Sequence, residues 1–129
     1  MICSQAERER SFFFSFLHLF FNEQLSNVYS YLDRLDEAIE FAKAGSDTRK
    51  RTYNVAHPEI VASIGMLANL HRNKEDYEQA LVYRIEGLDM VVEIFGEDHE
   101  YVGGTELSLG NVYNQLERFE EAKAHTLNA

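Results

Sequence analysis

Histidine and carboxylate side chains are the groups of this sequence that could hold a metal ion or move a proton. The chain has five histidines and 22 acidic residues. His57 and His99 stand 42 residues apart, and neither has a second ligand three or four residues away, the spacing expected of a zinc site on a helix. We therefore predict structural or solvated roles for the histidines and no metal site.

The sequence motifs also give little support for a catalytic nucleophile or a phosphate-binding loop. Gly103 and Gly104 are adjacent, lack a following lysine and fall inside a predicted helix, so they do not resemble a phosphate-binding loop. No serine stands in the context of a nucleophile elbow. Cys3 stands in an N-terminal tail without a rigid scaffold. The sequence therefore predicts that the protein is not an enzyme and binds no cofactor.

Side-chain amides recur at a fixed spacing, and each amide can both donate and accept a hydrogen bond. Asn27, Asn69 and Asn111 follow one another at intervals of 42 residues. Further columns repeat at the same interval: Leu25, Leu67 and Leu109; Leu35, Tyr77 and Phe119; Ala38, Ala80 and Ala122; Gly45, Gly87 and Ala129. A fixed period of this length indicates a solenoid of stacked repeats, whose elements must position the amides.

Each repeat is predicted to be a pair of helices. Apolar residues between Pro58 and about residue 74 recur at steps of three and four, which is typical of an amphipathic helix. A second helix is predicted from about Asp76 to Phe95. Gly96 follows it, and its counterpart one period earlier is Asn54; both residue types tolerate the left-handed conformation that ends many helices. We expect helical hairpins near residues 22–53, 58–95 and 100–129, and no strand.

The motifs in residues 67–71 (LANLH) and 76–80 (DYEQA), followed by Gly87 and Leu88, resemble the tetratricopeptide repeat. The 42-residue length and the junctions at 56–59 and 96–99 look like the kinesin light chain variety of that repeat. HEAT and armadillo repeats share this length range but lack this column of small residues. The resemblance implies an all-α fold, a right-handed superhelical solenoid of antiparallel helix pairs.

The repeats are predicted to occupy residues 22–129, divided at about 22–57, 58–99 and 100–129, with the last one incomplete. Residues 1–21 form an aromatic-rich segment outside the regular repeat. We expect this segment to be a helix that folds onto the first hairpin. A targeting segment and a replacement for a lost upstream repeat are the alternatives.

The resemblance implies a peptide-binding groove on the concave face, lined by the first helix of each repeat. Arg72 is the one basic residue among the inner positions that the resemblance assigns. The amides could grip the backbone of an extended peptide, or they could brace neighbouring hairpins; both readings stay open. The residues assigned to the groove are Asn27, Tyr31, Asn69, Arg72, Asn73, Asn111, Asn114 and Gln115.

The charge balance limits the classes of partner, and the cysteine content indicates the cellular compartment. With 22 acidic and 12 basic residues the net charge is −10, which disfavours nucleic acid. The run of apolar residues at 11–21 is too short to span a membrane. A single cysteine forms no internal disulfide and favours a reducing, cytoplasmic location.

We therefore expect a protein–protein interaction scaffold that binds a protein or peptide partner in its concave groove. A structural module that self-associates through the open C-terminal end at Ala129 and the aromatic segment at 12–21 is one alternative. A non-catalytic regulatory part of a larger enzyme or signalling protein is the other.

Overall fold

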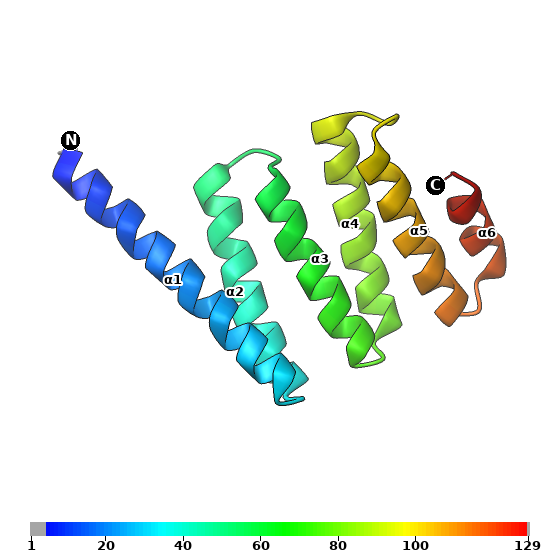
Figure 1. The fold of residues 1–129 in the computed structure, drawn as a ribbon, viewed down its shortest axis with the longest axis horizontal. Coiled ribbons are helices and arrows are strands. Elements are labelled where there is room, and N and C mark those ends of the chain that lie inside the picture. The colour runs from blue at the N-terminus through cyan, green and yellow to red at the C-terminus, as the bar shows by residue number, and fades with distance from the viewer. Residues whose placement is uncertain (1–4, 129) are drawn as a thin grey trace.

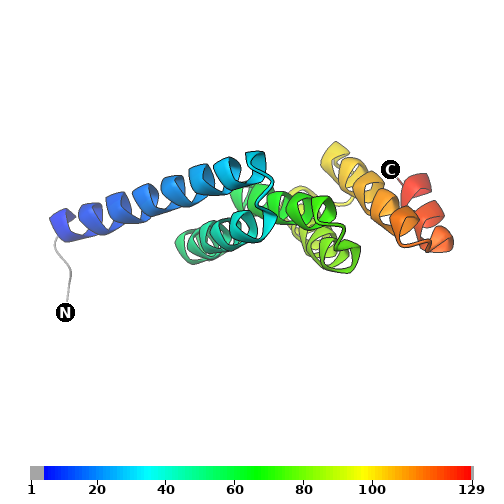
Figure 2. The same ribbon diagram turned by 90° about the horizontal axis from the view of Figure 1, so that it is seen from below.

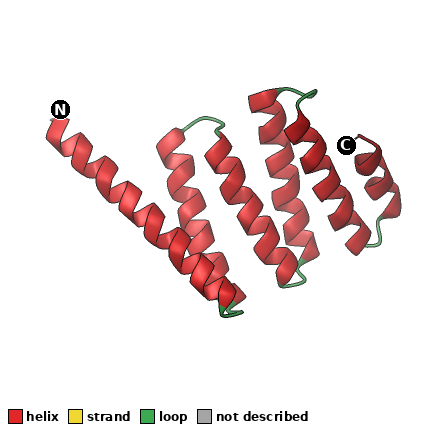
Figure 3. Cartoon of the chain, viewed as in Figure 1, coloured by secondary structure: helices red, strands yellow, loops and turns green. Residues whose placement is uncertain are grey.

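A computed structural model describes residues 5–128, except for the side chains of residues 11–13, 15, 16, 18, 119, 120, 122 and 128. The described chain consists of helices and the short turns between them, and it contains no strand (Figure 3). The helices are α1 Gln5–Tyr31, α2 Leu35–Tyr53, α3 Pro58–Asn73, α4 Tyr77–Phe95, α5 Glu100–Gln115 and α6 Phe119–Asn128. The all-α prediction is therefore confirmed.

The helices form three antiparallel hairpins that stack in chain order (Figure 1). Each helix packs against the one before it and the one after it, both within a hairpin and between hairpins. In the perpendicular view, α1 and α3 lie in one layer while α2 and α4 lie in the other (Figure 2). This arrangement is that of a solenoid, in which each repeat contacts only its neighbours.

Helix α1 is longer than the equivalent helices and differs from the expectation for the N-terminal segment. One period before Pro58, the start of α3, the chain is at residue 16, yet α1 already begins at Gln5. The aromatic segment is therefore the N-terminal part of α1 and not a separate helix that folds back. No proline stands near residue 21, and Asn22, a residue type that often caps helices, does not interrupt the helix. Its N-terminal half extends away from α2 in both ribbon views (Figures 1 and 2).

The turns within the hairpins recur at the 42-residue period of the sequence, and their backbone conformations are alike. Asp33, Glu75 and Glu117 close the three hairpins with positive φ angles of 59°, 64° and 59°. Asn54 ends α2 in the left-handed conformation, as expected, and Gly96 follows α4 with φ +85°. Equal turns at equal intervals keep the hairpins in the same orientation along the stack.

The two junction histidines begin the first helices of the second and third repeats. His57 Nδ1 accepts a hydrogen bond of 3.1 Å from the backbone N–H of Glu59, and His99 Nδ1 accepts one of 3.2 Å from that of Tyr101. The His57 ring also stacks on Tyr53 at 3.7 Å between centroids. Each histidine thus satisfies a backbone donor that the first turn of a helix leaves free. These contacts support the structural role predicted from the spacing.

Small residues let the two helices of a hairpin approach closely. Ala38 and Ala80 are fully buried, and so is Ala68 on the facing helix of the second hairpin. In the first hairpin, Ser26 takes the position of Ala68 and its hydroxyl donates a 2.9 Å hydrogen bond to the carbonyl oxygen of Ala38. Leucine, isoleucine and valine side chains fill the space between neighbouring hairpins.

Each hairpin contains a pair of stacked rings near its turn, and the three pairs recur at the 42-residue period. Tyr29 stacks on Phe41, His71 on Tyr83 and Tyr113 on His125, with centroids 5.4, 5.5 and 5.3 Å apart. His71 is therefore an inward-facing position, as its place in the tyrosine column predicted. The arrangement is shared by all three repeats.

Candidate functional site

A pocket of about 400 Å³ lies between α3 and α5, and α4 forms its floor. Apolar side chains dominate its lining, and Gly104 and Ala62 keep it open because they have little or no side chain. We call this region the α3–α5 groove. Its lining residues are Pro58, Val61, Ala62, Arg84, Val91, Phe95, Glu100, Tyr101, Gly104, Thr105 and Ser108.

Arg84 is the basic residue of this lining, and it comes from the second helix of its repeat. Its Nη2 donates a short hydrogen bond to the side-chain oxygen of Asn69. Its Nη1 lies 3.8 Å from the place that a Cβ atom at Gly65 would take. The guanidinium therefore lies next to α3. It reaches the face of the solenoid that α1, α3 and α5 form, which we call the first-helix face.

The electrostatic environment of Arg84 is unfavourable to its charge. Burial, and secondly the nearby positive charge of Arg72, lower the pKa of Arg84 below its ordinary value. Neither arginine forms an ion pair with a carboxylate of the described residues. Arginine stays charged in proteins, so two neighbouring guanidinium groups attract an anion to this face.

The equivalent region between α1 and α3 is arranged differently. Glu23 of α1 occupies the position that Gly65 has in α3, and it forms an ion pair with Arg49 of α2. Both side chains of this pair are largely removed from solvent. Val91 of α4 stands at the position equivalent to Arg49 and lines the α3–α5 groove. The second groove thus has no carboxylate at the position of Glu23, and the acidic residue of its lining is Glu100, at the N-terminal end of α5.

The eight residues assigned to the groove from the sequence lie on α1, α3 and α5, and all eight are exposed. Asn69 contacts Arg84 directly, and Arg72 lies close enough to alter its pKa. None of the eight lines the 400 Å³ pocket, which lies nearer the N-terminal ends of α3 and α5. The side chains of Asn27 and Asn111 form no hydrogen bond with the described residues. Their role as peptide contacts remains a prediction.

Arg84 lies on a second helix, whereas the resemblance assigns the groove to first helices, where Arg72 is the one basic inner residue. Its position nevertheless carries a signal. It falls three residues after Leu81 and seven before Val91, within the apolar stripe of α4. One period earlier the same column holds the buried Ala42. A charged residue in an apolar stripe must reach a polar surface or a partner.

Neither a cluster of metal ligands nor a membrane-spanning helix occurs among the described residues. Within 5–128, no group of three or more histidine, cysteine or acidic residues is arranged to hold a metal ion. None of the helices in that range is long and apolar enough to cross a membrane. Cys3 lies outside the described residues.

The fold and the groove define a helical-repeat protein built to present a continuous surface of stacked hairpins. Sequence profiles of the tetratricopeptide repeat match residues 23–59 and 60–125. The chain belongs to the tetratricopeptide repeat family, whose members generally mediate protein–protein interactions on a fold that is generally not catalytic. A comparison with curated proteins finds no match.

Solved structures of similar fold support the same assignment. The chain is similar to BtubC (BKLC) from P. vanneervenii with a TM-score of 0.74 and 19% identity, covering 85% of this chain and 43% of that one. It is also similar to the nearly identical TPR-like repeats of a Podosopora anserina protein described as a kinesin light chain. That match has a TM-score of 0.70 and 18% identity, and it covers 83% of this chain and 51% of the other. The chain thus spans about half the length of the structures that it matches.

Proposed function

We propose that the protein is a protein–protein interaction scaffold, in the cytoplasm, that binds an extended peptide segment of a partner along the first-helix face. The observation that carries this proposal is Arg84, which lies beside an apolar pocket without a carboxylate partner among the described residues. A peptide with a carboxylate next to an apolar side chain matches both features. The carboxylate pairs with Arg84 and Arg72, and the apolar side chain enters the pocket.

Charge and size both support this ligand. Removing a half-buried guanidinium from water is costly unless it is paired and hydrogen-bonded, and Asn69 supplies only one neutral hydrogen-bond acceptor. A pocket of about 400 Å³ is in the size range of sites for small ligands and can hold one large side chain. The exposed amides at Asn73, Asn111 and Asn114 extend the face on either side and can bind the backbone of the same peptide.

The first test is binding of synthetic peptides, measured by titration calorimetry on the full chain. A peptide array of apolar residues followed by Asp or Glu is compared with the same array carrying Asn or Gln. We expect binding to need the carboxylate and to weaken as salt rises, because exposed charge pairs are screened. Equal binding to the amide array would contradict the role of the arginines.

Substitutions then test which residues form the binding surface. Arg84→Gln is expected to weaken binding of the acidic peptides at least about tenfold, since a charge-assisted hydrogen bond is worth roughly 1.5–3 kcal/mol. Asn69→Ala is expected to weaken it by a smaller factor. Arg51→Gln, an exposed arginine of α2 outside this face, is the matched control and leaves affinity unchanged.

Gly65→Glu provides the sharpest variant because it copies the arrangement of the first groove. A glutamate at residue 65 stands where Glu23 stands and brings its own carboxylate to Arg84. The helix accepts a Cβ there, because its nearest neighbour is Arg84 Nη1 at an ordinary contact distance of 3.8 Å. We expect this variant to be folded and unable to bind the acidic peptides. Unchanged binding would mean that the ligand does not use Arg84.

A further inference from the structure

The face of α1 opposite α2 carries apolar residues whose counterparts are buried elsewhere in the same molecule. Leu67 of α3 and Leu109 of α5 are 2% and 0% exposed, while Leu25, their counterpart in α1, is 37% exposed. Val28 is 52% exposed, and its counterparts Leu70 and Val112 are 5% and 2% exposed. In α3 and α5 these columns pack against the preceding hairpin. No hairpin among the described residues 5–128 packs against these two positions of α1.

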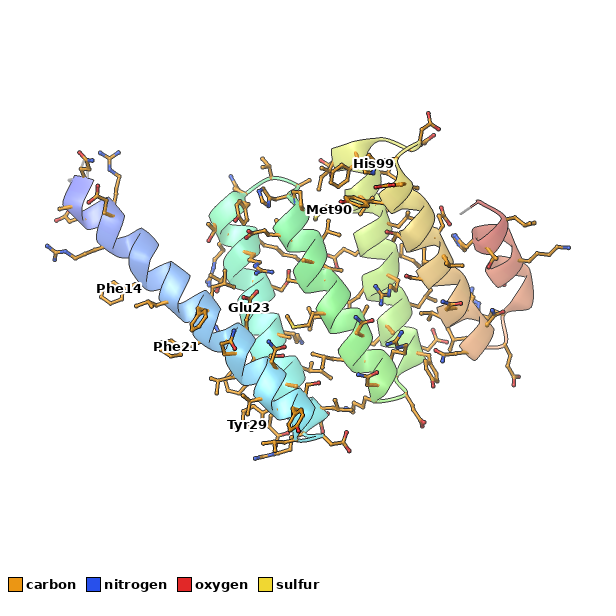
Figure 4. All side chains as sticks on the ribbon, viewed as in Figure 1. Phe14, Phe21, Glu23, Tyr29, Met90 and His99 are labelled. Carbon is orange, nitrogen blue, oxygen red and sulfur yellow. The ribbon has the colours of Figure 1, made fainter. Side chains whose placement is uncertain are left out.

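These residues belong to a continuous stripe along α1. Phe21, Leu25, Val28 and Leu32 follow one another at steps of four, three and four, which places them on one side of a helix. Phe21 and Leu32 are also more than half exposed. Figure 4 shows Phe14 and Phe21 on the side of α1 that faces away from the stacked hairpins, whereas Glu23 points toward α2. We call Phe21, Leu25, Val28 and Leu32 the α1 stripe.

The part of α1 that carries the stripe has little charge of its own. Residues 11–32 contain one acidic residue and no lysine or arginine, while the whole chain has a net charge of −10. The one acidic residue, Glu23, is neutralised by its ion pair with Arg49. Two copies that meet through their outer helices bring acidic surfaces together, and like charges repel. The α1 stripe is a surface through which two copies can approach with little of that repulsion.

The exposed apolar side chains on this side of α1 extend from Phe14 to Leu32, which is about 28 Å of helix. Two such faces bury on the order of a few hundred Å² per copy, which is less than the roughly 800 Å² per partner of a standard interface and corresponds to a weak, concentration-dependent dimer. An exposed apolar patch of this kind generally marks an interaction site.

We infer that the α1 stripe is the interface of a homodimer, in which the stripes of two copies pack against each other about a twofold axis. A twofold contact uses the same surface on both copies, and the uncharged, apolar stripe is complementary to itself. The inference goes beyond the proposed peptide binding and does not depend on it, because the α3–α5 groove lies on other helices.

The test compares the mass of the full chain in solution with that of two matched variants, by light scattering and sedimentation over about a hundredfold range of concentration. Val28→Glu places a charge in the α1 stripe. Val82→Glu makes the same change on α4, at a valine that is 55% exposed. Because both valines are exposed in the single chain, both variants are expected to fold, which circular dichroism at low concentration checks.

We expect the wild-type chain and Val82→Glu to shift from 14.9 kDa to twice that mass as concentration rises. Val28→Glu is expected to remain at 14.9 kDa, with a dissociation constant raised at least about tenfold by the burial of an unpaired carboxylate. A wild-type chain that stays a monomer would overturn the inference, and so would a Val28→Glu dimer. A mass that grows beyond two copies would indicate head-to-tail stacking and would also overturn it.

Discussion

Glu23 and Gly65 occupy equivalent positions in α1 and α3, and the grooves that they border differ accordingly. In the groove between α1 and α3, Glu23 neutralises Arg49, so the charges are satisfied within the chain. In the α3–α5 groove, glycine removes the carboxylate, and Arg84 comes close to the vacant position. Two repeats with the same backbone therefore differ in the charges that they leave without an internal partner. In a repeat protein, one repeat can lack the neutralising side chain that an equivalent repeat contains.

The apolar packing beneath the two grooves is expected to be equivalent. Substitutions there should have the largest effects on the free energy of unfolding. We expect Leu67→Ala and Leu109→Ala each to lower the free energy of unfolding by about 2–5 kcal/mol, because both leave a cavity. Leu25→Ala, at the same column of α1, is expected to cost less than about 1 kcal/mol at low protein concentration. Urea unfolding of the three variants gives the comparison. A large difference between Leu67→Ala and Leu109→Ala would show that the two interfaces are not equivalent.

The arginines of the two grooves should differ in their effect on stability. Arg49→Ala leaves Glu23 unpaired and mostly buried, and we expect a loss of about 1–3 kcal/mol. Arg84→Ala removes a charge that burial already disfavours, and it should change stability by less than about 1 kcal/mol. The same unfolding experiment measures both variants. If Arg84→Ala proves to be the more destabilising of the two, the guanidinium has a stabilising partner and the contrast between the grooves fails.

Gly65 leaves the groove open, and we expect it to lower the stability of α3. We expect Gly65→Ala to raise the free energy of unfolding by about 0.5–1 kcal/mol, since glycine is unfavourable inside a helix and the new Cβ meets only Arg84 Nη1, at 3.8 Å. Ala62→Gly, on the exposed side of the same helix, is the control and should have the opposite sign. A thermal melt that shows Gly65→Ala to be destabilised would mean that the position has no room for a side chain.

The hairpin turns provide the smallest effect, and one in which the repeats should agree. Asp33, Glu75 and Glu117 each adopt a positive φ that is unfavourable for residues other than glycine. Glu75→Gly is expected to stabilise the chain by a few tenths of a kcal/mol, because relief of the strain is partly offset by the entropy of glycine. Asp33→Gly should give a similar value in the same melts. Opposite signs would show that the turns carry different strains.

The repeat, the helices and most of the turns could be predicted from the amino-acid sequence. Local rules suffice for these features: Pro58 suits a first helical turn, Asn54 ends a helix in the left-handed conformation, and columns at a 42-residue period repeat the same geometry. The length of α1 could not be read from the period, because residues 5–15 match no other repeat and Asn22, a residue type that often caps helices, lies inside the helix.

The pairing of charged side chains could not be predicted without the packing of the hairpins. Arg84 has no charged counterpart in its column, where Ala42 and Thr126 stand, so the period gave no sign that it reaches Asn69 beneath α3. The exposure of Leu25 was equally hidden, because its column looks the same in all three repeats. The physical reason is that burial and charge pairing are properties of the neighbouring hairpin, which the residue's own helix does not encode.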